Sequence, residues 1–168
     1  LSDQLDEWRA AWRGNLSNFK TLYHSTDSDS ARKIVQSGMM KRGSDGCMFG
    51  SGIYFAESPA IAEAKAWHGP HQSAIIEAEV ALGRCYEPKH SETFTHRALR
   101  KKGYDSVWAR PRPDGPMNTS QEWVVYSKYQ VRLLSVKVDG KELLYKRAKE
   151  GGLLSASERG RPVGARSG

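Results

Sequence analysis

The chain has 168 residues, 38% of them hydrophobic and 27% charged, which suits one domain with a modest apolar core. Its net charge of +7 is uneven: residues 1–88 carry 9 basic and 11 acidic side chains, and residues 89–168 carry 17 and 8. No apolar run approaches the roughly 18 residues of a membrane-spanning helix, and no charged-then-apolar leader predicts secretion, so we expect no membrane association.

Periodicity and helix-capping residues predict the elements. Apolar residues at helical spacing, with acidic residues early and basic residues late, predict a helix over 1–13. Ser28 or Asp29 can cap a second helix that Gly38 ends, and Ser58 followed by proline opens a third. The expected order is helix 1–13, strand 20–24, helix 29–37, loop 41–52, strand 53–55, helix 58–67, strands 73–82 and 85–86, helix 92–102, strand 104–108, loop 110–120, and strands 122–126 and 131–138.

Many short strands at close spacing, with few helices, predict an α+β domain built on mainly antiparallel sheets. The apolar alternation of the last strand changes phase at Leu133-Leu134, which is typical of a β-bulge. Residues 150–168 are mostly glycine, serine and arginine, and we expect a disordered basic tail there. The remaining residues, 1–149, are then a single domain with its core over 20–138.

Cysteine content and charge bear on compartment and partners. Two cysteines, Cys47 and Cys85, are too few for a disulfide scaffold or a four-cysteine zinc site. We expect free thiols in a reducing compartment, the cytoplasm or the nucleus. The basic half can attract nucleic acid or a nucleotide, although a solvated face with a basic tail is the simpler interpretation.

Three positions combine a chemically useful side chain with the end of a strand. His24 lies in YHST, Tyr54 in FGSGIYFA and Glu122 in QEWVVY. Glycines beside the tyrosine allow another backbone or a flat ligand to approach closely. A carboxylate opening an apolar strand is costly to bury unless it is exposed or functional. Taken singly, the three have structural alternatives: a hydrogen-bonded histidine, a core tyrosine and an exposed glutamate.

Together and in this order, the three residues resemble the signature of the poly(ADP-ribose) polymerase catalytic domain, a diphtheria-toxin-like ADP-ribosyltransferase family. That signature is a histidine, a tyrosine and a glutamate on three separate strands. The resemblance covers roughly residues 20–138, and further stretches that agree with it are 74–87, 103–109 and 122–138. It implies two packed sheets with a cleft between them, and a pentosyl-transferring enzyme that cleaves the nicotinamide–ribose bond of NAD.

The resemblance also implies a role for each residue. Glu122 would stabilise the ribosyl cation, hold the 2′-hydroxyl and polarise the acceptor as general base. Tyr54 would stack on nicotinamide, and His24 would hold a ribose hydroxyl while backbone groups beside it bind the carboxamide. The residues implied to contact NAD are His24, Ser25, Thr26, Gly52, Tyr54 and Ser58. NAD is the co-substrate, and no metal is expected.

Several positions depart from the family pattern. Ser25 follows the histidine where the family usually has glycine. Counted without gaps from the tyrosine, Ala62 stands where the family often has a serine and Lys65 where it has a second stacking tyrosine. If the helix is offset, Ser58, Trp67 or His68 would form this second wall of the nicotinamide pocket instead.

The acceptor and the outcome of the reaction are open in the sequence. The expected partners are NAD and a macromolecular acceptor, either protein or nucleic acid, and the protein is expected to be a monomer. The short loop over 110–120 favours transfer of one ADP-ribose, although the retained glutamate leaves elongation possible. Alternatives are an NAD glycohydrolase, an inactive relative that binds protein or nucleic acid, and an RNA 2′-phosphotransferase, in which Glu122 has no evident role.

Overall fold

The structure is a computed structural model that describes residues 18–43, 49–65, 73–89, 92–111 and 121–143. The elements are β1 (Phe19–Asp27), α2 (Ser28–Ser37), β2 (Ile53–Phe55), α3 (Pro59–Lys65), β3 (Ser73–Ala81), β4 (Cys85–Tyr86), α4 (His96–Lys101), β5 (Ser106–Ala109), β6 (Glu122–Val125), the 3-10 turn η1 (Lys128–Gln130), β7 (Val131–Val138) and β8 (Lys141–Glu142). The helix expected over 1–13 and the tail over 150–168 lie outside the described residues.

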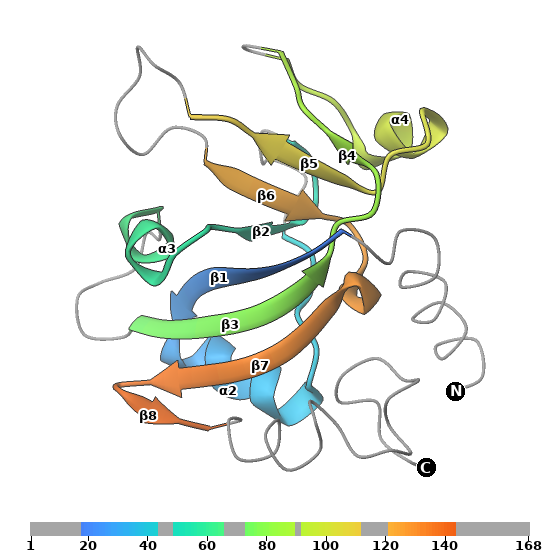
Figure 1. Ribbon diagram of the computed structural model, residues 1–168. Helices are drawn as coiled ribbons and strands as arrows, with labels where there is room; N and C mark the ends of the chain where they lie inside the picture. Colours follow the sequence, from blue (N-terminus) through green and yellow to red (C-terminus); the bar gives the residue numbers. More distant parts are fainter. Residues whose placement is uncertain (1–17, 44–48, 66–72, 90–91, 112–120, 144–168) are drawn as a thin grey trace, which may run out of the picture.

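Two four-stranded sheets form the domain, which confirms the α+β prediction (Figure 1). One sheet has the strand order β1-β3-β7-β8 and the other β2-β6-β5-β4. Pairing is antiparallel throughout, except that β4 and β5 run parallel. The sheets meet where β1 lies beside β2: Tyr23 and Ala56 each donate a backbone N–H to the other's carbonyl, both at 2.8 Å.

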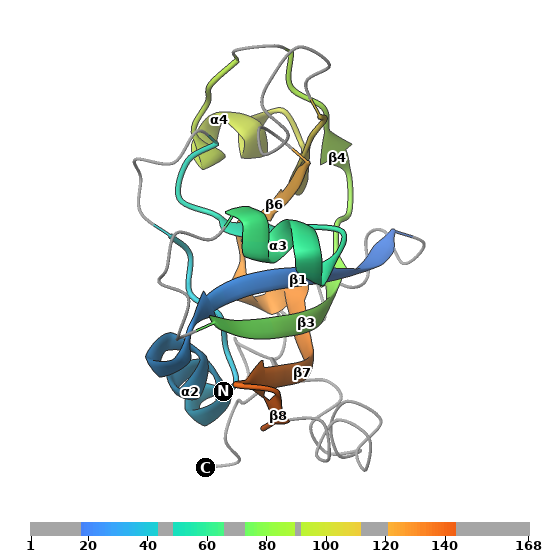
Figure 2. The same ribbon diagram turned by 90° about the vertical axis from the view of Figure 1, so that its left-hand side faces the viewer.

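The second sheet is packed on both of its faces. The face formed by Ile53, Phe55 and Val125 joins the first sheet and α2 in the main core, where Ile76 and Val136 are fully buried. The opposite face packs in a smaller core with Leu99 of α4, and its members are Phe49, Leu99, Val107, Ala109, Val124 and Tyr126. In the turned view, α3 lies across β1, which it contacts together with β3 (Figure 2). Helix α3 therefore stands beside the junction of the two sheets.

The bulge predicted in the last long strand is confirmed. Along β3 and β7 the register shifts between Glu77 and Ala78, whose partners are Ser135 and Leu133. Leu134 is the extra residue between those partners. The shift moves the buried set from odd to even positions, so that Val136 and Val138 remain in the core.

Some expected boundaries were wrong. The N-cap of α2 is Asp27 rather than Ser28 or Asp29, because the helix begins one residue early and the Asp27 carboxylate accepts the Ser30 N–H at 2.8 Å. Gly38 ends that helix in the left-handed conformation, as predicted. The helix expected over 92–102 covers only 96–101, the strand expected over 104–108 covers 106–109, and β8 was not expected.

Candidate active site

A cavity of about 190 Å³ opens at the junction of the two sheets. Strands β1, β2 and β6 and helix α3 supply its lining: Tyr23, His24, Ser25, Tyr54, Phe55, Ala56, Ala62, Lys65 and Glu122. The three residues singled out in the sequence, His24, Tyr54 and Glu122, all belong to it. A concave site with a few convergent polar groups is what a small-molecule ligand requires.

His24 links the two sheets through its side chain. Its Nδ1 lies 2.7 Å from the carbonyl oxygen of Tyr54, on the neighbouring sheet. A carbonyl can only accept a hydrogen bond, so Nδ1 carries the proton. The ring also packs edge-on against Phe55, with centroids 6.1 Å apart. These contacts fix the imidazole relative to β2 before any ligand is present.

The Tyr54 side chain is held by hydrogen bonds at its hydroxyl and by packing of its ring. The hydroxyl donates to the carbonyl of Gly50 at 2.8 Å and accepts the N–H of Phe49 at 3.1 Å. Its ring packs against the smaller core. Gly50 permits this arrangement because its φ of 79° is one that side-chain-bearing residues rarely adopt. The side-chain torsions of Tyr54 are therefore restricted, and its ring is held in place on the cavity wall before a ligand binds.

Glu122 begins β6 on the same face of the sheet as Tyr54. Tyr54 pairs with Val124, and alternate residues of a strand share a face, so Glu122 emerges beside the tyrosine. The preceding residue, Gln121, has a φ of 64° and donates its N–H to the carbonyl of Ala109 at 2.7 Å. This turn fixes the start of β6, and with it the backbone of Glu122.

The Glu122 carboxylate is partly buried and has one cationic neighbour among the described residues, Lys65. Burial raises its pKa above the usual range, and the nearby Lys65 ammonium opposes that rise. Lys65 Nζ is 3.7 Å from Oε1, and the two side chains are 13% and 26% exposed. The carboxylate is thus partly desolvated, which strengthens its interaction with any positive charge that enters the cavity.

The family model of the poly(ADP-ribose) polymerase catalytic domain matches the sequence over residues 2–115, more than half of the chain. The chain belongs to that family. The matched region contains His24 and Tyr54 and ends before Glu122. A search of curated proteins found no match.

Helix α3 supplies part of the cavity lining. Helix α3 brings Ala62 and Lys65 to the cavity, as ungapped counting from the tyrosine predicted. That Lys65 stands where the family pattern has a second aromatic ring follows from ungapped counting alone and stays a prediction. Trp67 and His68 lie outside the described residues.

Of the other residues expected to contact NAD, one lines the cavity and three do not belong to its described lining. Ser25 lines the cavity, whereas Thr26, Gly52 and Ser58 are absent from its described lining. Ser58 instead caps α3 by accepting the N–H of Ile61 at 3.2 Å. As contacts to NAD, all six residues, His24 and Tyr54 included, stay predictions.

Gly52 has a structural reason to be glycine. A Cβ at this position would lie 2.4 Å from Val124 Cγ1 and 3.1 Å from the carbonyl oxygen of Val125. The residue lets the loop before β2 approach β6, the strand that carries Glu122. Gly52→Ala should lower the free energy of unfolding by roughly 1–3 kcal/mol through overpacking. Chemical denaturation measures it, and unchanged stability would show that this close approach is absent.

Sequence reasoning missed Tyr23, Phe55 and Ala56 as lining residues. Phe55 and Ala56 directly follow Tyr54, and Tyr23 directly precedes His24. The missing information was the pairing of Tyr23 with Ala56, which joins the two segments. It also missed the ion pair between Lys65 and Glu122, since no local pattern connects α3 with β6.

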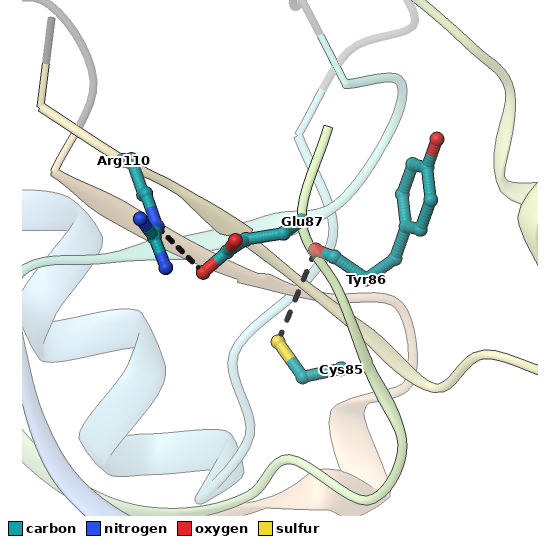
Figure 3. Close-up of polar contacts among 4 residues, drawn as sticks. All are labelled: Cys85, Tyr86, Glu87 and Arg110. Atoms are coloured by element: carbon teal, nitrogen blue, oxygen red, sulfur yellow. Dashed lines mark hydrogen bonds and ion pairs between the residues drawn. The ribbon is translucent and has the colours of Figure 1, made fainter. Parts of the chain in front are cut away.

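A separate set of polar contacts joins Cys85 and Tyr86 of β4, and Glu87 with Arg110 (Figure 3). None of these four residues is among the described lining of the cavity. Glu87 accepts a hydrogen bond from Arg110 Nε at 2.7 Å, with both side chains exposed. Cys85 is a free thiol in contact with the Tyr86 carbonyl at 4.0 Å, and burial raises its pKa. Such a thiol stays protonated at neutral pH and is a poor nucleophile.

The described residues contain neither a candidate membrane-spanning helix nor a candidate metal cluster. None of the described helices is long and apolar enough to cross a membrane. No group of three or more histidine, cysteine, aspartate or glutamate side chains within these ranges is placed to hold a metal ion. That the reaction needs no metal stays a prediction.

Proposed function

We propose that this domain is an NAD-dependent ADP-ribosyltransferase that transfers one ADP-ribose to a macromolecular acceptor. One observation carries the proposal: His24, Tyr54 and Glu122, from three strands and two sheets, line a single cavity. Membership of the poly(ADP-ribose) polymerase catalytic-domain family supports it. Location in the cytoplasm or nucleus and a monomeric state stay predictions.

The proposed reaction does not require a general acid, because nicotinamide leaves without being protonated. The bond between ribose C1′ and the nicotinamide nitrogen breaks, and both electrons go to the nitrogen, so the leaving group departs neutral. A positively charged ribosyl centre remains until the acceptor's nucleophile bonds to C1′ and loses its proton. The main requirement is therefore negative charge near the sugar, fixed in advance.

The cavity residues fit these demands. Tyr54 offers a ring, held by the backbone of Phe49 and Gly50, on which a flat nicotinamide can stack. Glu122 offers a partly desolvated carboxylate for the ribosyl cation and its hydroxyls. His24, oriented by the Tyr54 carbonyl, has the polarity to hold a ribose hydroxyl. Backbone groups at Ser25 would bind the carboxamide.

The acceptor decides between transfer and NAD glycohydrolysis. The experiment incubates the protein with NAD labelled in the adenosine half, alone and with protein, DNA or RNA. Nicotinamide release with label on one polymer supports transfer and identifies the acceptor class. Nicotinamide release with label only in free ADP-ribose would assign glycohydrolysis instead. No nicotinamide release under any condition would leave an inactive binding module.

The number of ADP-ribose units is read from the same samples. We expect one unit for each modified site, since the loop over 110–120 is short. Ladders of increasing mass on the labelled polymer would contradict this expectation and show chain elongation.

A further inference from the structure

The ion pair in the cavity differs from the others in the described part of the chain. Four pairs are present there, and three have side chains between 32% and 70% exposed: Lys20–Glu57, Arg110–Glu87 and Lys137–Glu142. In the fourth, Lys65 is 13% and Glu122 26% exposed. Exposed ion pairs are screened by water and contribute little to folding stability. A partly buried charge, by contrast, is stabilised mainly by its partner, and removing that partner leaves the charge uncompensated.

Lys65 is also the one lysine or arginine among the described lining residues of the cavity. Strand β1 contributes Tyr23 and His24 to the surroundings of Glu122, and β2 contributes Tyr54. On β5 the residue paired with Glu122 is an alanine. Of these groups, only the histidine could add a second positive charge, by taking up a proton on Nε2, because its Nδ1–H already donates to a backbone carbonyl.

We infer that Lys65 is a positioning residue that keeps Glu122 ionised and holds its Oε1 in place. The inference rests on the proposed function for its catalytic meaning. Lys65 is the last residue of the short helix α3. The Ser58 hydroxyl caps the first turn of this helix, which fixes the backbone from which the Lys65 side chain extends towards Glu122. A carboxylate accepts several hydrogen bonds, so the lysine leaves Glu122 with capacity for a ribose hydroxyl.

The inference predicts a change in how Glu122 titrates. Without Lys65, burial acts on the carboxylate unopposed, and its pKa should rise further. A raised pKa means that a smaller fraction is ionised at acidic pH, whereas full ionisation returns at alkaline pH. In Lys65→Met, nicotinamide release should therefore fall relative to the parent at the acidic end of the range, by at most tenfold for each unit that the Glu122 midpoint rises, and approach that of the parent at alkaline pH. Lys65→Arg should restore the parent profile.

The experiment has two readouts. The titration of Glu122 is followed by NMR on protein carrying carbon-13-labelled glutamate, without NAD, and Glu122→Gln identifies its signal. The rate of nicotinamide release is measured across pH 6–9 for the same proteins. Lys137→Met is the matched control, because it removes the lysine of an exposed ion pair. Equal thermal midpoints show that variants are folded, and Lys65→Gln replaces Lys65→Met if the latter is unstable.

Each outcome has a definite meaning. A higher Glu122 midpoint together with a shifted rate profile supports the inference. An unmoved midpoint overturns it, as does a moved midpoint with an unchanged rate profile. Faster turnover by Lys65→Met at every pH also overturns it, since Lys65 would then be blocking Glu122. If the parent releases no nicotinamide, the proposed function fails, and the NMR midpoint alone decides whether Lys65 keeps Glu122 ionised.

Discussion

Replacing Glu122 by glutamine should reduce nicotinamide release from NAD by roughly 10²–10³-fold, the usual cost of losing one preorganised electrostatic partner. Glutamine keeps the shape and most of the hydrogen-bonding capacity of glutamate but removes its charge. The charge acts on the ribosyl cation, which exists only near the transition state. NAD affinity should therefore change far less than turnover.

Glu87→Gln is a matched control for this substitution. It removes the same charge from a glutamate that is also paired with a cation, Arg110, but that lies away from the cavity. The control should retain the parent's rate. Rates and NAD affinities are compared at equal fold stability. A Glu122→Gln rate within about threefold of the parent would remove Glu122 from the catalytic role, since that is well under one 1.36 kcal/mol step.

Replacing Tyr54 by alanine should abolish most of the stabilisation that NAD gives the folded protein. A ligand that binds only the native state adds about 2.7 kcal/mol at a hundredfold excess over Kd. Removing the stacking face weakens binding, so the same NAD concentration becomes far less saturating. The measurement is the free energy of unfolding with and without NAD.

Tyr54→Ala also deletes a packed ring, so the free protein itself should be less stable. Tyr54→Phe separates the two effects: it loses the bonds to Phe49 and Gly50 but keeps the ring. We expect it to be less stable than the parent and still stabilised by NAD. An undiminished NAD effect in Tyr54→Ala would place nicotinamide elsewhere.

Much of the fold was predictable because its strands carry clear local patterns. The phase change at Leu133-Leu134 located the bulge, and Gly38 and Pro59 marked helix boundaries. The order of strands within each sheet was not predictable. It depends on contacts between distant segments, such as β1 with β3 and β2 with β6, which alternation along one strand does not encode.

The candidate site likewise has parts that the sequence could predict and parts that it could not. His24, Tyr54 and Glu122 were singled out because of their order and spacing taken together, and the structure brings them to one cavity, while their roles stay predictions. The ion pair of Glu122 with Lys65 depends on a distance between α3 and β6 that only the folded chain determines. The glycine at position 52 allowed either a ligand or a backbone to approach, and the structure places β6 against it.

The junction between the sheets offers a spectroscopic report of binding that needs no substitution. Tyr23 and Ala56 both line the cavity, and each donates its amide proton across the junction at 2.8 Å. A molecule in the cavity should shift both amide resonances together and slow their exchange with solvent. A molecule bound only to the basic residues of the second half of the chain would leave the two signals where they are. This pair of resonances would therefore distinguish a ligand of the cavity from an anion attracted merely by charge.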